Sequence, residues 1–109
     1  MSAFYIVSLK HTPRRDRYIT FWRPDNCGYA WPLSWAGKYG RETVEDDFDY
    51  YNNGSDTIAV PCEFVDTLAI APLKGMIDSD AGPVVLNTAD YWRALIHMLI
   101  AEPQHRPKP

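Results

Sequence analysis

The stretch AFYIVSLKHTPRRDRYITFWRPDNCGYAWPL, residues 3–33, decides the fold, because strand-like segments alternate in it with strong chain breakers. Segments rich in aromatic and β-branched residues predict three strands, at residues 3–10, 17–23 and 29–33. In the second segment, the period-two alternation puts Tyr18 and Trp22 on one face and Phe21 on the other. We therefore expect a three-stranded antiparallel meander whose second strand is covered on both faces.

Two turns separate these strands. The first, HTPRRD at residues 11–16, contains a proline without a backbone donor and an aspartate that favours local turns. The second, PDNCG at residues 24–28, offers Asn26 and Gly28 for a positive φ angle. Pro32 restricts the third strand to an edge or an end of the sheet.

The pattern becomes helical in the middle of the chain. Apolar residues spaced by four and three predict an amphipathic helix over residues 42–51, ended by Asn52, Asn53 and Gly54. Its inward residues are Val44, Phe48 and Tyr51, and its acidic side carries Glu45, Asp46 and Asp49.

Further elements follow this helix. DTIAV at residues 56–60 predicts a short strand, and PCEFVDTLAI at residues 61–70 predicts a helix with Pro61 in its first turn. Residues 71–85 have no periodicity and contain several breakers, so they are expected to form a loop.

The C-terminal segment completes the prediction of the fold. NTADYWRALIHMLIAE at residues 87–102 predicts a helix that Asn87 or Thr88 caps. The whole pattern predicts an α+β fold, in which the N-terminal meander packs with two or three helices. We expect residues 1–102 to form a single domain and residues 103–109 to form a flexible tail.

Charge is unevenly distributed along the 109 residues. Residues 1–41 carry seven Lys/Arg and two Asp, a sum of +5, whereas residues 42–90 carry eleven acids and one Lys, a sum of −10. The net charge of −3 therefore conceals a basic and an acidic sector. The two sectors either attract each other in the folded chain or each face a partner of opposite charge.

The sequence contains none of the motifs that carry catalysis or metal binding. It has no nucleophile elbow and no phosphate-binding glycine loop, and a Cys27 nucleophile with His11 as base would lack an orienting third group. Asp78 and Asp80 are too few for a calcium loop, and Cys27 and Cys62 cannot close a zinc site. We therefore expect no catalytic residues, no metal and no cofactor.

Cellular location is predicted from equally simple features. No apolar run approaches the roughly 20 residues that span a bilayer, and the N-terminus lacks a signal-peptide pattern. We therefore expect a cytosolic protein without membrane contact. In the cytosol, Cys27 and Cys62 are expected to be free thiols, buried or half-buried.

Aromatic residues concentrate in residues 21–39, which hold three of the four tryptophans. A chain this short is not expected to bury every ring, so at least one of Trp31, Trp35 and Tyr39 should be partly exposed; the alternative is that all pack as core. Trp, Tyr and Arg dominate protein–protein hot spots. The predicted binding residues are Arg14, Arg15, Arg17, Trp22, Arg23, Tyr29, Trp31, Trp35 and Tyr39.

The segment TFWRPDNCGYAWPLSWAGKY resembles a module of small, uncharacterised phage and prophage proteins. The matching residues are Trp22, Pro24, Gly28, Tyr29, Ala36, Gly37 and Tyr39. The resemblance covers about the first half of the chain. It implies a phage accessory gene, a class that includes compact non-enzymatic binders such as anti-CRISPR and other anti-defence proteins.

The expected function is therefore a phage-type binding protein that blocks or sequesters a host protein or protein–nucleic-acid complex in the host cytosol. Its predicted interface lies in residues 14–39. The acidic helix around Glu45–Asp49 is a second candidate surface, because it would imitate phosphate charge. One alternative is a nucleotide or single-stranded nucleic-acid binder that uses aromatic stacking and arginine. Another is an enzyme with an unrecognised site, and the oligomeric state stays open.

Overall fold

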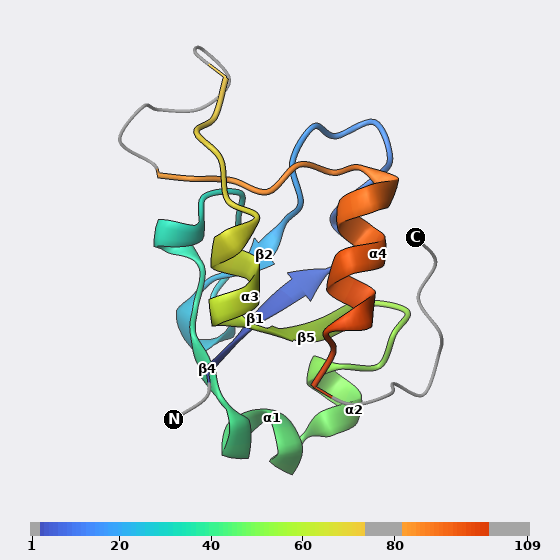
Figure 1. The fold of residues 1–109 in the computed structure, drawn as a ribbon. Coiled ribbons are helices and arrows are strands. Elements are labelled where there is room, and N and C mark those ends of the chain that lie inside the picture. The colour runs from blue at the N-terminus through green and yellow to red at the C-terminus, as the bar shows by residue number, and fades with distance from the viewer. Residues whose placement is uncertain (1–2, 74–81, 101–109) are drawn as a thin grey trace.

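A five-stranded antiparallel sheet with four α-helices forms an α+β fold, as the sequence predicts (Figure 1). The computed structural model describes residues 3–73 and 82–100. The strands are β1 (Ala3–Ser8), β2 (Phe21–Trp22), β3 (Tyr29–Ala30), β4 (Tyr39–Gly40) and β5 (Thr57–Pro61). The helices are α1 (Arg41–Asp46), α2 (Phe48–Tyr51), α3 (Cys62–Thr67) and α4 (Ala89–His97).

Strand β1 is the centre of the sheet. β5 pairs along one edge of β1, from Phe4 to Ser8. Since a strand has only two edges, β2 and β4 share the other: Val7 lies opposite Phe21 of β2, and Phe4 lies opposite Tyr39 of β4. β3 extends the sheet beyond β2, so the expected meander is confirmed. The pairing of β1 with β5 and with β4 is the part that local patterns do not predict.

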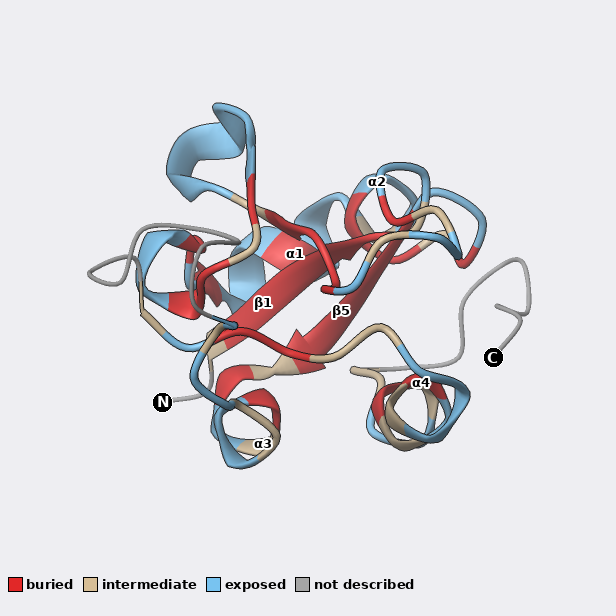
Figure 2. Cartoon of the chain, turned by 90° about the horizontal axis from the view of Figure 1, so that it is seen from above, coloured by how far each residue is buried: buried red, intermediate tan, exposed pale blue. Residues whose placement is uncertain are grey.

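The alternation of β1 divides the interior into two cores. Tyr5 and Val7 point into the first core, on the side that α3 and α4 cover. Phe4 and Ile6 point into the second core, which also contains Val44 of α1. Figure 2 shows the two pairs of helices on opposite sides of β1 and β5. Both faces of the sheet are therefore covered, which explains why β1 and β5 are apolar on both sides.

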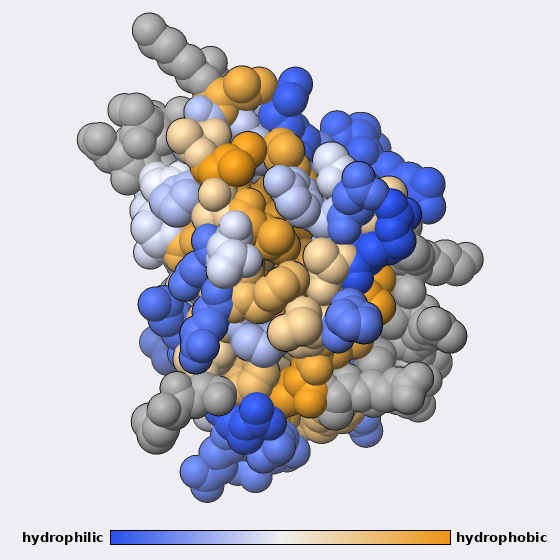
Figure 3. Space-filling model, viewed as in Figure 1, coloured by the Kyte–Doolittle hydropathy of each residue, from blue (hydrophilic) through white to orange (hydrophobic). Residues whose placement is uncertain are grey.

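The side that α3 and α4 cover also carries apolar residues at the surface. Figure 3 shows a band of hydrophobic residues running down this face between hydrophilic flanks. The first core has a rim of side chains that are only partly buried, and among them are Phe64, Leu68, Tyr91 and Leu99.

The segment before β2 departs from the expected strand over residues 17–23. The N–H of Ile19 donates to the carbonyl of Val85 at 2.9 Å, and the N–H of Asn87 donates to the carbonyl of Arg17 at 2.8 Å. The residues before α4 therefore run beside this segment, and β2 itself is limited to two residues. The expectation of burial on both faces is nevertheless confirmed, because Tyr18 and Phe21 are buried.

The helix expected over residues 42–51 is broken into α1 and α2 at Asp47, whose φ and ψ are −139° and 55°. Aspartate interrupts helices because its short side chain competes for nearby backbone groups. The expected facing is kept, since Val44 and Tyr51 are buried in the second core and Phe48 is partly buried.

The two later helices are shorter than expected. β5 runs through Pro61, which stands at the N-cap of α3 and not in its first turn. α3 ends at Thr67 and α4 ends at His97. The expected cap of α4 is confirmed, because the hydroxyl of Thr88 accepts a hydrogen bond from the N–H of Tyr91.

Some of the predicted features lie outside the described residues. Of the loop expected at residues 71–85, only residues 71–73 and 82–85 are described, and Val84 forms an antiparallel bridge with Ile70, which precedes the loop. Asp78, Asp80 and the tail expected at residues 103–109 lie outside the described residues.

Candidate functional site

The turn between β1 and β2 presents three arginines to solvent. Arg14, Arg15 and Arg17 are exposed, and none forms an ion pair with a described residue. A guanidinium stays charged at all physiological pH values and offers a planar set of five donors. This turn therefore has a net positive charge even with Asp16 included, and its arginines are free of ion pairs with described residues.

One side chain, Asn87, holds this turn in place. Its Nδ2 donates to the carbonyls of Pro13 and Asp16, at 3.0 Å and 2.8 Å. Its Oδ1 accepts a 2.5 Å hydrogen bond from Nε1 of Trp92, which lies on α4. The arginine turn is thereby fastened to α4, although the two segments are more than 70 residues apart in sequence.

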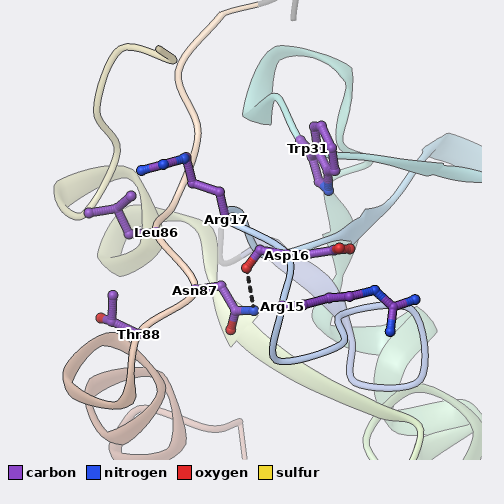
Figure 4. Close-up of a pocket in the computed structure, with 7 residues that line it drawn as sticks. All are labelled: Arg15, Asp16, Arg17, Trp31, Leu86, Asn87 and Thr88. Carbon is purple, nitrogen blue, oxygen red and sulfur yellow. Dashed lines mark hydrogen bonds between the residues drawn. The ribbon is translucent and has the colours of Figure 1, made fainter. Parts of the chain in front are cut away.

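A groove of about 570 Å³ lies where these segments meet (Figure 4). Its lining includes Arg15, Asp16, Arg17 and Trp31 together with Asn87 and Thr88. In Figure 4, Arg15 and Arg17 extend to opposite sides of Asp16.

Trp31 is the aromatic member of the groove. Its ring is partly exposed and packs edge-on against the buried ring of Tyr18, with centroids 5.7 Å apart. The hydroxyl of Tyr18 in turn accepts a hydrogen bond from the N–H of Leu73 at 2.8 Å. The contact with Tyr18 therefore fixes the orientation of the partly exposed Trp31 ring.

A second pair combines a ring and a cation. The guanidinium carbon of Arg23 lies 5.3 Å from the ring centroid of Trp35, within the range of a cation–π contact. Trp35 is 45% exposed, so the expectation that at least one ring of this region faces solvent is confirmed. We call Arg14, Arg15, Arg17, Arg23, Trp31 and Trp35 the aromatic–basic surface.

Trp22 and Tyr29 form a separate group. They are cross-strand partners of β2 and β3, so their side chains share one face of the hairpin. Trp22 packs edge-on against Tyr50 and Tyr51 of α2, and Tyr29 packs against His11 with ring centroids 4.1 Å apart. Tyr29 is 48% exposed, whereas Trp22 is mostly used in packing.

Tyr39 has an internal position, unlike the other predicted binding residues. It is only 7% exposed, and its hydroxyl donates to the carbonyl of Arg23 and accepts from the N–H of Asn26. Burial raises the pKa of Tyr39, an effect that the hydrogen bond from Asn26 partly opposes. Its place in the structure is therefore to hold the turn at residues 24–28.

That turn is built as the sequence predicts. Asn26 and Gly28 have positive φ angles of 57° and 106°, and Asp25 has one of 59°. The N–H of Cys27 donates to the carbonyl of Pro24, which gives a type I′ turn with Asp25 and Asn26 at its centre.

A second, polar pocket of about 440 Å³ lies beside this turn. Asn26, Lys38, Tyr39, Thr43 and Tyr51 contribute to its lining. The hydroxyl groups of Tyr39 and Tyr51 are both hydrogen-bonded to Asn26. Because these polar side chains hydrogen-bond to one another, the polar lining of this pocket is explained by their role in stabilising the turn.

The acidic helix residues are exposed, as expected, on α1 and α2. Glu45 forms an ion pair of 3.6 Å with Arg41, and both side chains are half exposed. Such an exposed pair contributes little to stability. Asp46 and Asp49 are exposed and remain available as a second candidate surface.

The two cysteines are free thiols, as expected, but they differ in environment. Cys62 is buried, and burial followed by the nearby Asp66 carboxylate raises the pKa of its thiol to about 11. Cys27 is exposed, so the expectation of two buried or half-buried thiols is wrong for Cys27. It lies in the outward type I′ turn, where its Sγ donates to the carbonyl of Asp25.

No helix in residues 3–73 or 82–100 is long and apolar enough to cross a bilayer. Within the same ranges, no group of three or more His, Cys, Asp and Glu side chains is arranged to hold a metal ion.

Comparison of the chain with protein-family models, curated proteins and solved structures found no match. The site must therefore be interpreted from its own geometry.

The structure brings together only part of the predicted site. Arg15, Arg17 and Trp31 meet in the groove, Arg23 pairs with Trp35, and Tyr39 lies inside. Sequence reasoning missed the residues before α4, namely Leu86, Asn87 and Thr88, as part of this groove. Asn87 was recognisable only as a candidate helix cap, because its partners Pro13 and Asp16 are distant in sequence.

Proposed function

We propose that this chain is a small, non-enzymatic binding protein of phage-accessory type, which blocks or sequesters a host macromolecule through the aromatic–basic surface. The observation that supports this most is the set of three exposed arginines, without ion pairs among the described residues, on a turn that Asn87 fastens to α4. Neither the type of gene nor the host component follows from the geometry, and both stand as part of the proposal.

Physical chemistry favours binding at such a surface. Tryptophan and arginine contribute most to protein interfaces, because each buries a large area and offers polar atoms. Ordering a mobile loop weakens association, and a turn already held by hydrogen bonds avoids much of that cost. Arg14, Arg15 and Arg17 also break no ion pair with a described residue when they bind a partner.

The non-enzymatic part of the proposal rests on the surroundings of the reactive side chains. Cys27 donates to a backbone carbonyl in its own turn, and His11 packs on Tyr29. These contacts do not join a nucleophile to a base, which is the commonest arrangement for activating a nucleophile.

The proposal is tested by capture from host lysate with the immobilised chain, followed by quantitative mass spectrometry. Arg14→Ala with Arg17→Ala removes two charges from the aromatic–basic surface. Lys38→Ala with Arg93→Ala removes two exposed charges elsewhere and serves as the matched control. We expect the first double variant to lose a partner that the wild type and the control retain. Equal capture by all three proteins would overturn the proposal.

A further inference from the structure

We infer that the groove between Trp31, the arginine turn and the segment before α4 is a subsite for single-stranded nucleic acid. It takes one base against Trp31 and phosphates of the strand on Arg15 and Arg17. This inference rests on the proposed function and names the chemical class of the partner.

The charges of the groove favour a phosphate strand. Arg15 and Arg17 line it without ion pairs to described residues, and Arg14 is exposed on the same turn. Guanidinium groups match phosphate oxygens in geometry as well as charge. Because Arg15 and Arg17 extend to opposite sides of Asp16 in Figure 4, they suit two phosphates of a strand better than the single phosphate of a mononucleotide.

The aromatic member of the groove favours a single strand over a duplex. Trp31 is partly exposed, and Tyr18 packs edge-on against it from the interior. A base must be unstacked from its neighbours to lie on such a ring, and bases inside a duplex are not. The volume of about 570 Å³ is also suitable for a ligand portion of nucleotide size.

The groove has few groups that would read the identity of a base. Both amide hydrogens of Asn87 are occupied by the carbonyls of Pro13 and Asp16. The hydroxyl of Thr88 accepts the N–H of Tyr91 as a helix cap. Recognition by charge and stacking alone tolerates many sequences, so we expect weak base preference.

Among the described residues that line the groove, Asp16 carries the one carboxylate that opposes phosphate binding. In Figure 4 its carboxylate points to the side on which Arg15 extends, while its backbone carbonyl accepts a hydrogen bond from Asn87. Removal of this charge should therefore strengthen binding, in contrast to removal of an arginine.

The test is fluorescence anisotropy with labelled oligothymidine of about 12 nucleotides, at several salt concentrations. We expect Trp31→Leu to weaken binding about tenfold, because stacking is lost. Trp31→Phe keeps a ring and should lose less, and it preserves the test if Trp31→Leu fails to fold. Arg17→Ala should reduce the slope of log affinity against log salt by about 0.7, the value for one phosphate contact. Asp16→Asn should bind more tightly.

Arg93→Ala is the matched control, because it removes an exposed arginine outside the groove. Unchanged affinity for Arg17→Ala and Asp16→Asn, or equal binding of thymidine monophosphate, would overturn the inference. A duplex that binds as tightly as the single strand would also overturn it. If lysate capture depends on Arg14 and Arg17 but oligothymidine does not bind, the proposed function stands and this inference fails. If oligothymidine binds as expected but lysate capture does not depend on Arg14 and Arg17, the proposed function alone is rejected.

Discussion

The side chains of Asn87 and Trp92 are joined by a 2.5 Å hydrogen bond from the indole Nε1 to the amide Oδ1. This bond orients the amide so that its two hydrogens face the carbonyls of Pro13 and Asp16. The Asn87 side chain thus links Trp92 of α4 to the arginine turn, and the shape of the candidate groove depends on this link.

Asn87→Ala should lower the free energy of unfolding by about 2–3 kcal/mol, because three side-chain hydrogen bonds are lost at a partly buried site. Thr88→Ala is the control, since it removes only the helix cap and should cost about 1 kcal/mol. Urea unfolding measures both. If the two variants are equally stable, the link that Asn87 makes between α4 and the arginine turn is energetically unimportant.

Gly37→Ala should destabilise the chain by about 1–3 kcal/mol through overpacking. A methyl group at Gly37 would lie 2.8 Å from both Cα of Pro24 and Cε1 of Tyr39, and the first of these is backbone that cannot swing away. Gly40→Ala is the matched control, because a methyl group there meets no atom within 4 Å. Thermal unfolding of the two variants should differ clearly, and similar melting temperatures would contradict the close approach.

Stability should decrease between about pH 9 and pH 11 through Cys62. Burial raises the pKa of its thiol from 9.0 to about 11, so the unfolded chain loses this proton at lower pH than the folded chain. The stabilising effect is complete below pH 9 and is lost as pH rises through the folded pKa. Cys62→Ala should remove about 2 kcal/mol of this pH dependence, measured by urea unfolding across the range. Parallel curves for wild type and variant would refute the assignment.

Acrylamide quenching of tryptophan fluorescence should report mainly Trp35, which is 45% exposed. Trp35→Phe is expected to remove the most accessible fraction of the signal. Trp92→Phe should leave that fraction unchanged, because Trp92 is only 8% exposed and is held by Asn87. Quenching that persists in full after Trp35→Phe would show that another indole dominates.

Local sequence patterns were sufficient to predict the structure where a residue's partner lies nearby in sequence or at a regular spacing. The meander, the inward facing of Val44 and Tyr51, and the capping of α4 by Thr88 were all predictable in this way. The break in the acidic helix at Asp47 could not be predicted in this way. The neighbouring aspartates have the same helix propensity, so the sequence does not show which of them interrupts the helix.

The burial of individual aromatic residues was also beyond local reasoning. Trp35 and Tyr39 are four residues apart, yet one faces solvent and the other is internal. The difference comes from tertiary neighbours: Tyr39 lies in β4 against β1, whereas Trp35 is the last residue of a short 3₁₀ helix, Leu33–Trp35, outside the sheet.

The sequence by itself determined the α+β class, the order of most elements, and the concentration of arginines and rings before residue 40. Those properties depend on amino-acid composition and on the short-range spacing of apolar residues, both of which can be read from each segment by itself. Only the tertiary structure decided that residues 85–87 run beside residues 17–19, and so placed Asn87 and Thr88 against Arg15, Arg17 and Trp31. The reason is that hydrogen bonds between segments distant in sequence form only once both cores have brought those segments together.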